Sequence, residues 1–190
     1  MLDILREEIK SCTKCSLCKD MPGTKPVPGQ GSKSRIMIVG EALGKDESFV
    51  EEPFVGRCGK LLTKMLSEAG IDREKVYVTN VVKCRPTKNG GTCNRAPTNE
   101  EIGECKEWLY KEILEVNPEV VITLGKVPTY TLLRETLKKS FRLIDVVGEY
   151  TRVYGYNVIP AYHPSFIMGH GRKKLEEEIE IFRKVANDTK

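Results

Sequence analysis

The sequence is poor in histidine and has no long apolar run. Its only histidines, His163 and His170, lie far from the cysteine-rich segment SCTKCSLCKD, so a Cys2His2 zinc site built from neighbouring residues is not expected. No apolar run approaches the ~18 to 20 residues that cross a bilayer. The stretch MLDILREEIK carries acidic residues and indicates a short amphipathic helix rather than a signal peptide. We therefore expect a cytoplasmic protein with no membrane partner.

The sequence also lacks internal repeats and any strong charge imbalance. No period of ~20 to 50 residues is present, so a repeat protein is not expected. The 190 residues, 39% of them hydrophobic, suffice for one core but are few for two, and we expect a single domain over residues 1–190. The net charge of +4 fits many soluble enzymes as easily as a nucleic-acid binder. Local basic groups stand at Lys83 and Arg85 and at residues 172–174.

Four short apolar runs rich in β-branched residues alternate with helical patterns. The runs are RIMIVG, KVYVTN, EVVITLG and YNVIPAYH, ending at residues 40, 80, 125 and 163. Helical patterns cover residues 60–71, 98–117 and 126–137, the second with Thr98 as a cap and Glu101 as its partner. This alternation predicts an α/β fold, a three-layer α/β/α sandwich around a mostly parallel four-stranded sheet.

Function is expected where these strands end. In open α/β sheets, ligands bind beyond the carboxyl ends of the strands. The segments that follow the four runs are GEALGKDE, NVVKCRP, GKVP and HPSFIM. Each has an ordinary structural explanation on its own, such as a tight turn at Gly40, a cap at Asn80 or a satisfied core histidine at His163. Their coincidence at strand ends favours a shared site.

The seven cysteines are an odd number, and in a reducing compartment such clusters indicate metal binding or catalysis before disulfides. A four-thiolate site could hold zinc or an iron-sulfur cluster, and spacing alone does not choose between them. A ferredoxin-like electron carrier is disfavoured because the C-x3-C-P half of that motif is absent. Cys58 is assigned to packing. The candidate ligands are two from the N-terminal group together with downstream cysteines: Cys12, Cys15, Cys18, Cys84, Cys93 and Cys105.

Seven motifs in order resemble the family 4 uracil-DNA glycosylases, the iron-sulfur type known mainly from thermophilic archaea and bacteria. They are C-x2-C at residues 12–15, VPGQG, GEALG, EPFVG-x-x-GKLL, TNVVKCRP, a helical cysteine at 105, and HPS at 163–165. The resemblance implies a monomeric, monofunctional enzyme of base excision repair. Such an enzyme flips uracil out of single- or double-stranded DNA and hydrolyses its N-glycosidic bond, leaving an abasic site.

The resemblance implies a structural 4Fe-4S cluster held by four cysteines. Cys18 stands where the family usually has another residue. Relative to the family pattern, the insertion KNGGTCNRA at residues 88–96 adds Cys93 as a rival ligand. The segment TNEEIGEC resumes the family pattern, which favours the helical cysteine. The implied ligands are Cys12, Cys15, Cys84 and Cys105.

The resemblance also implies a uracil pocket. Phe54 matches the aromatic residue that stacks on the base. Asn80 matches the amide that pairs with the uracil edge, donating to O4 and accepting from N3-H, and cytosine presents the opposite polarity there. Glu47 occupies the position beside C5, where thymine carries its methyl group. His163 matches the residue that donates a hydrogen bond to O2, where negative charge develops.

The loop after the first strand is expected to line the same pocket through Gly40, Glu41, Ala42 and Leu43. Better-known glycosylases carry an aspartate where this chain has Ala42, so Glu41 is the nearest carboxylate that could position the water. Because the bond breaks dissociatively, the ~10² to 10⁴ usually ascribed to general-base help could be partly dispensed with. Leu43 replaces a proline of the family motif.

The segment after HPS implies a DNA contact. In the family, this loop enters the minor groove and keeps the nucleotide flipped. Side chains assigned to this contact are the apolar Phe166, Ile167 and Met168, the phosphate-binding Arg172 and Lys173, and Ser165 of the motif itself.

Three alternatives stay open from the sequence. A family 5-like glycosylase would have broader base choice, but Glu41 and GEALG argue against it. A relative that traps uracil covalently uses a histidine in an extra basic loop, and the 88–96 insertion contains none. A non-catalytic iron-sulfur DNA-binding module would bind uracil DNA without releasing the base.

Overall fold

A five-stranded sheet forms the centre of the computed structural model, which describes residues 1–20, 25–88, 90–137 and 140–189. Its strand order is β2-β1-β5-β7-β6. The four expected strands are all parallel: β1 Ile36–Ala42, β2 Tyr77–Val82, β5 Val120–Leu124 and β7 Tyr156–Ala161. The expected number of four strands was wrong by one, because β6 Thr151–Val153 adds an antiparallel edge strand to β7.

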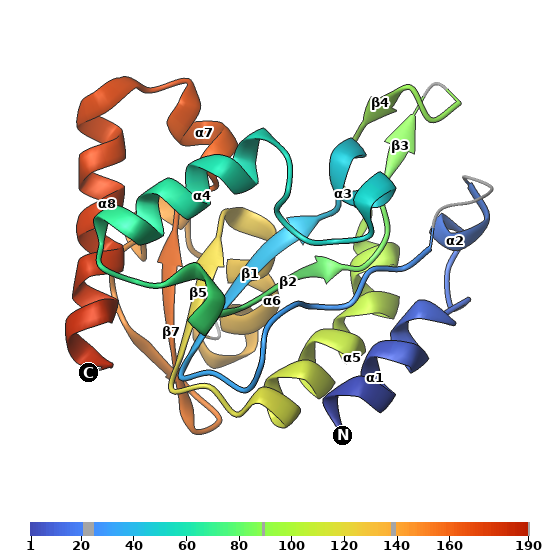
Figure 1. The fold of residues 1–190 in the computed structure, drawn as a ribbon, viewed down its shortest axis with the longest axis horizontal. Helices are drawn as coiled ribbons and strands as arrows, with labels where there is room; N and C mark the ends of the chain where they lie inside the picture. Colours follow the sequence, from blue (N-terminus) through green and yellow to red (C-terminus); the bar gives the residue numbers. More distant parts are fainter. Residues whose placement is uncertain (21–24, 89, 138–139, 190) are drawn as a thin grey trace.

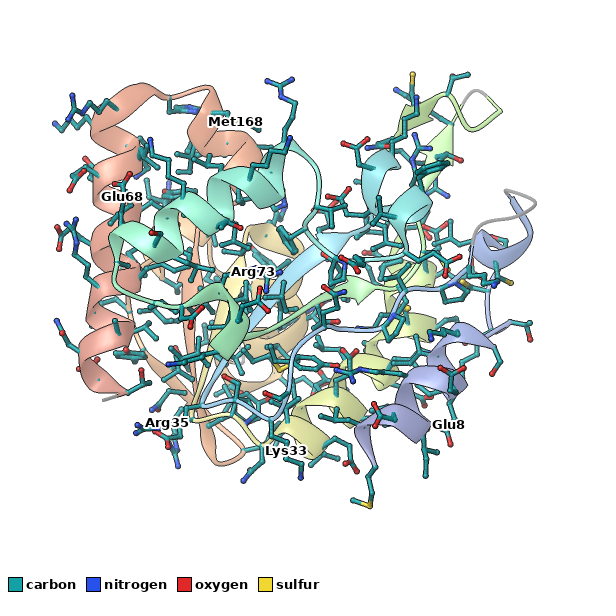
Figure 2. All side chains as sticks on the ribbon, viewed as in Figure 1. Glu8, Lys33, Arg35, Glu68, Arg73 and Met168 are labelled. Carbon is teal, nitrogen blue, oxygen red and sulfur yellow. The ribbon has the colours of Figure 1, made fainter. Side chains whose placement is uncertain are left out.

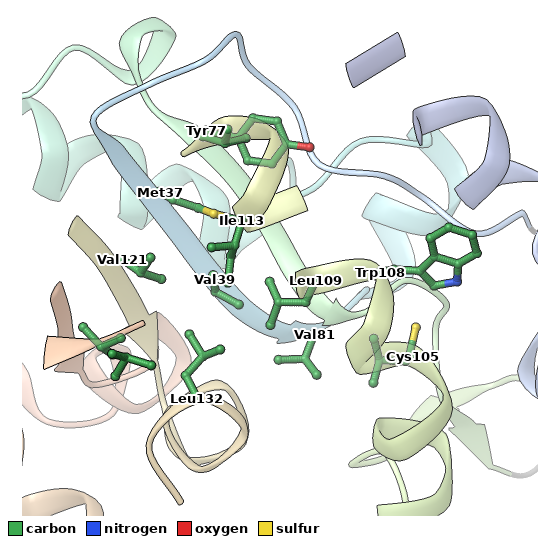
Figure 3. Close-up of a cluster of buried hydrophobic side chains, with 14 of the residues drawn as sticks. Met37, Val39, Tyr77, Val81, Cys105, Trp108, Leu109, Ile113, Val121 and Leu132 are labelled. Atoms are coloured by element: carbon green, nitrogen blue, oxygen red, sulfur yellow. The ribbon is translucent and has the colours of Figure 1, made fainter. Parts of the chain in front are cut away.

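Helices cover both faces of the sheet, which gives the expected three layers (Figure 1). Alternating side chains of the strands supply the two cores, and in β1 Met37 and Val39 face one side while Ile36 and Ile38 face the other. On the first side lie α1 Leu2–Lys10, α5 Asn99–Val116 and α6 Lys126–Leu137, and Figure 3 shows part of their packing against the sheet. On the second side lie α4 Arg57–Glu68 and α8 Gly171–Asp188.

The remaining elements are short and sit mostly around the carboxyl ends of the strands. Residues 88–96, the expected insertion, contribute to a small separate hairpin of β3 and β4. The short elements are α2 Leu17–Asp20, α3 Lys45–Val50, the 3-10 turn Arg73–Lys75, β3 Thr87–Lys88, β4 Cys93–Asn94, the 3-10 turn Leu143–Asp145 and α7 Pro164–Met168.

The outer edge of β2 is covered by the VPGQG segment. Gln30 and Val78 exchange backbone hydrogen bonds of 2.9 and 2.8 Å, and Val27 N–H donates to the carbonyl of Lys83 at 2.7 Å. This pairing protects a strand edge that would otherwise be open to aggregation. Within the described part of the chain, no helix is long and apolar enough to cross a membrane.

Candidate active site

A cleft of about 490 Å³ opens at the carboxyl ends of the strands. It brings together eight of the residues singled out from the sequence, although they come from four separate segments of the chain. These lining residues are Glu41, Ala42, Leu43, Glu47, Phe54, Asn80, His163 and Ser165. The cleft therefore lies where function was expected, at the carboxyl ends of the strands.

Phe54 reaches the cleft from a loop with unusual backbone geometry. Its φ angle is +59°, in the left-handed region that a bulky residue rarely adopts. A Cβ atom at Gly59 would overlap the carbonyl of Phe54, so only glycine allows helix α4 to lie this close to the loop. Such strained positions persist where the surrounding structure over-determines them, often at ligand sites. The Phe54 ring is tilted by 39° to that of His163, with centroids 6.3 Å apart.

Gly40 lies between Phe54 and Asn80 but, contrary to expectation, is not one of the residues that line the cleft. It pairs with Asn80 across the β1–β2 register. A Cβ atom at Gly40 would overlap both the Asn80 Oδ1 atom and the Phe54 ring. The glycine therefore serves close packing of the two predicted base-contacting side chains, which is a more specific role than the tight turn that the sequence also allowed.

The geometry fixes the tautomer of His163. The backbone N–H of Ser165, which can only donate, points to His163 Nδ1 at 3.2 Å, so Nδ1 is an acceptor. The Ser165 hydroxyl must then also donate to Nδ1, at 2.8 Å. Burial lowers the pKa of His163, opposed by the nearby charge of Glu47. The imidazole is therefore neutral, with its proton on Nε2 available as a donor.

Of the three carboxylates that line the cleft, the two that the sequence singled out differ in their surroundings. Burial raises the pKa of Glu41 above its ordinary value. Glu47, on α3, accepts a hydrogen bond of 2.8 Å from the backbone N–H of Gly56 through Oε1. Gly56 caps helix α4 just after the Phe54 loop. Glu47 thus fastens the two ends of the loop that presents Phe54, in addition to lining the cleft.

Several further residues line the cleft that the sequence analysis did not assign to the uracil pocket, among them Cys58, which it assigned to packing. The most informative are Asn94 and Arg95, which reach it from the β3–β4 hairpin. Asn94 Oδ1 accepts from Arg85 Nε at 2.7 Å, and Arg95 forms two hydrogen bonds with Glu101 at 2.8 and 2.6 Å. The position of the 88–96 insertion after a strand end was the available signal. The others are Gly44, Lys45, Asp46, Gly56, Arg57, Cys58, Gly125 and Lys126.

The segment predicted to contact DNA is a short helix, α7, whose apolar residues divide into two groups. Ile167 is only 2% exposed and packs inside, whereas Phe166 and Met168 are 39% and 43% exposed. Met168 is labelled near the top of the molecule in Figure 2. Phe166 is stacked between Tyr162 and His170, with ring centroids 4.7 and 3.7 Å away. Arg172 and Lys173, at the start of α8, are exposed.

A second, smaller cavity is lined by five cysteines: Cys12, Cys15, Cys18, Cys84 and Cys105. Two of their sulfur atoms accept hydrogen bonds, Cys12 Sγ from Trp108 Nε1 at 3.1 Å and Cys105 Sγ from the backbone N–H of Lys83 at 3.2 Å. Cys18 Sγ donates to the carbonyl of Cys15 at 3.0 Å. Cys93 is exposed on β4 and does not line this cavity. Cys58 does not line it either, but lines the strand-end cleft.

The thiols of this cavity influence one another. Burial raises the pKa of Cys15, Cys84 and Cys105, the last to about 11, and the neighbouring thiols raise these pKa values further. A metal centre binds cysteines as thiolates, so metal binding at these thiols would release protons. In the described residues, no three His, Cys, Asp or Glu side chains are arranged to hold a metal ion as they stand.

Comparison with known proteins places the chain in a family. Residues 28–186 match the family model described as "Uracil DNA glycosylase superfamily". A type-4 uracil-DNA glycosylase of Saccharolobus solfataricus is 41% identical over 97% of this chain and 84% of its own length. Another, from Archaeoglobus fulgidus, is 40% identical over 97% of this chain and 92% of its own. The chain is a type-4 uracil-DNA glycosylase.

Within this superfamily the type-5 alternative is less similar. A type-5 uracil-DNA glycosylase of Pyrobaculum aerophilum is 28% identical over 87% of this chain and 70% of its own length. The type-4 assignment agrees with the GEALG loop and the cysteine pattern of the sequence.

Proposed function

We propose that this chain excises uracil from DNA in base excision repair, hydrolysing the N-glycosidic bond and leaving an abasic site. The observation that carries the proposal is the convergence of Phe54, Asn80 and His163 on one cleft, although they come from three separate segments. The reaction needs a surface for the flipped base, a reader of its edge and a donor at O2, and these three side chains supply them in turn.

Base recognition rests on Phe54 and Asn80. The Phe54 ring offers a stacking face for the flipped uracil, a contact worth roughly 1 to 3 kcal/mol. The Asn80 amide can donate to O4 and accept from N3-H. Cytosine reverses both polarities and would leave buried groups unpaired, a mismatch that can be worth about 10⁴-fold in selectivity.

Bond cleavage rests on His163. As the glycosidic bond breaks, negative charge collects on uracil, chiefly at O2. His163 lines the cleft, and because Ser165 holds its Nδ1 as an acceptor, Nε2–H is the ring donor that can serve O2. A pre-positioned donor of this kind is worth about 10² to 10³ in rate.

The carboxylates and the apolar loop complete the cleft. Glu41 positions the attacking water, and Glu47 stands beside C5, where it excludes the thymine methyl group. Ala42 and Leu43 supply backbone and apolar walls, and Gly40 allows Phe54 and Asn80 to pack closely. Phe166 and Met168 contact the opened duplex, while Ser165, Arg172 and Lys173 contact its backbone. The buried Ile167 anchors helix α7 and leaves DNA contact to its two neighbours.

We also propose that Cys12, Cys15, Cys84 and Cys105 hold a 4Fe-4S cluster. The donor set fits, since all four thiols line one cavity and two of the sulfurs accept N–H hydrogen bonds, as cluster ligands do. Cys18 lines the same cavity and is the rival ligand. When bound, the cluster would fasten the N-terminal segment to α5 and the loop after β2. We further propose that residues 1–190 form a single domain that acts as a monomer.

The direct test is base release. Anaerobically purified protein is incubated with labelled oligonucleotides carrying uracil, thymine or hypoxanthine at one site, in single and double strands, and abasic sites are detected by alkaline cleavage. We expect cleavage at uracil and none at thymine. Tight binding to uracil DNA without base release would instead indicate the non-catalytic binding module.

A further inference from the structure

Lys83 and Glu112 form a buried ion pair beneath the strand-end cleft that is proposed to bind the uracil base, called the base cleft below. Lys83 Nζ is 2.6 Å from Glu112 Oε2, and the two side chains are 1% and 0% exposed. Removing both charges from water costs several kcal/mol per ion, and apolar residues of similar volume often serve stability as well or better. Stability alone therefore does not explain why a charged pair occupies this buried position.

Lys83 uses all three of its ammonium donors. Besides Glu112, its Nζ donates to Thr79 Oγ1 at 2.6 Å and to the backbone carbonyl of Asn80 at 2.7 Å. An ammonium group has three donors, so none is left over. One of them holds the main chain of the residue proposed to read the uracil edge.

Glu112, on α5, is equally saturated. Its Oε1 accepts from the backbone N–H of Gly29 at 2.7 Å and from the Tyr77 hydroxyl at 3.1 Å. Its Oε2 accepts from Thr79 Oγ1 at 2.8 Å as well as from Lys83. A Cβ atom at Gly29 would overlap the Tyr77 ring, which gives the VPGQG motif a physical reason. The carboxylate thus joins α5, β2 and the VPGQG segment at one point.

The same lysine borders the cysteine cavity. Its backbone N–H donates to Cys105 Sγ, and the residue is one of those that line that cavity. Lys83 therefore stands between the Asn80 carbonyl and the thiol-lined cavity. Its neighbour in sequence, Cys84, is a proposed cluster ligand.

We propose that the Lys83–Glu112 pair positions Asn80 for uracil recognition, by clamping the Asn80 carbonyl from below so that the side-chain amide keeps a single orientation in the cleft. Lys83 and Glu112 are positioning residues in this role, since neither lines the base cleft. The inference rests on the proposed function of the cleft. A misplacement of about 1 Å at a reacting or recognition group can cost about 10²-fold in rate.

The test separates positioning from stability by using three variants: Lys83→Met, Glu112→Gln and the double variant that combines these two substitutions. Either single variant leaves an uncompensated buried charge and lowers the melting temperature, whereas the double variant has no buried charge, keeps a side-chain acceptor for Gly29 and Tyr77, and largely restores it. We expect uracil excision at saturating DNA to fall by about 10²-fold in the double variant even though its melting temperature and iron content are close to those of the wild type.

A double-mutant cycle with Asn80→Ala supplies the second measurement. If the pair acts through Asn80, adding the double substitution to Asn80→Ala slows excision by less than about threefold further, because the effects are not additive. Two controls accompany it. Arg35→Met removes an exposed pair with Glu119, at the opposite end of the strands where Figure 2 labels Arg35. Val185→Ala weakens the core in α8 without touching the network.

Two results would overturn the inference. One is recovery of both stability and excision rate in the double variant, which would make the pair purely structural. The other is full additivity with Asn80→Ala. Uracil release by the wild-type protein is measured in the same series, so a failure of the proposed function would show as an inactive wild type and is distinguishable from either result.

Discussion

At the scale of single residues, the cleft depends on backbone positions that few side chains tolerate. Phe54 sits at a positive φ angle, and Gly40 and Gly59 provide the close approaches around it. Motifs in the sequence marked these glycines, but the strain at Phe54 is a property of the folded loop. The buried state of Lys83 was equally hidden, because a lysine two residues from an arginine is typical of a solvated basic surface.

Replacing Gly40 by alanine tests the close packing of Phe54 and Asn80 around this position. The added methyl group would displace the Asn80 amide or the Phe54 ring, so we expect uracil excision to fall by about 10²-fold. The measurement is the single-turnover rate on a uracil oligonucleotide.

Gly103→Ala is the matched control for this substitution. Gly103 lies in α5 with no atom near its would-be Cβ, so the change should leave the rate unaltered and stabilise the helix by roughly 0.5 to 1 kcal/mol. Equal rates for wild type and Gly40→Ala would contradict the assigned role of Gly40.

The pH dependence of excision tests the protonation state of His163. Its pKa is lowered by burial, and protonation of Nδ1 would set a hydrogen against the Ser165 N–H. The active neutral form should therefore persist at pH 6.5, and the rate should fall only below that pH. We would measure single-turnover rates from pH 4.5 to 9. An acid limb centred above pH 7 would show that the imidazole acts in another state.

At the scale of elements, the sequence predicted most of the long ones but missed the 18-residue helix α8 and the short ones. Helix α6 matches residues 126–137, and the expected cap of α5 is present, with Thr98 and Glu101 forming a capping box. These succeed because local periodicity and capping decide them. Strand β6 and the β3–β4 hairpin span two or three residues each, and tertiary pairing decides them. The burial of Ile167 beside exposed neighbours also follows from packing.

Helix α8 carries a buried carboxyl group with a measurable consequence. Glu178 accepts from the backbone N–H of Tyr162 through Oε1, while its Oε2 is without a partner among the described residues. Burial raises its pKa to about 7. The folded protein therefore holds a proton there that the unfolded chain loses near pH 4.5, so this group's contribution to stability declines as the pH rises from about 4.5 to 7.

Glu178→Gln should remove that decline. We expect the free energy of unfolding, measured with urea at pH 5 and pH 8, to favour the variant more at pH 8, by at most about 3 kcal/mol. Glu177→Gln is the control, since Glu177 is exposed and paired with Lys174. An unchanged difference between the two pH values would mean that Glu178 stays ionised throughout.

At the scale of the whole molecule, the proposed cluster joins parts of the chain that are far apart in sequence. Cys105→Ser should abolish the brown colour and the iron content of anaerobically purified protein and lower its melting temperature. Cys93→Ser should change neither, because Cys93 is exposed on β4 outside the cavity. Cys18→Ser tests the rival ligand in the same way. A colourless wild-type protein with stoichiometric zinc would rule out the cluster.

The central claim is that the strand-end cleft is a uracil pocket in which His163 stabilises the departing base. The most direct measurement is the single-turnover rate of uracil release by wild type and His163→Ala, with DNA binding measured in parallel. The account predicts rapid release by the wild type and a loss of about 10² to 10³-fold in the variant, with DNA affinity nearly unchanged. Equal rates for the two proteins would contradict it.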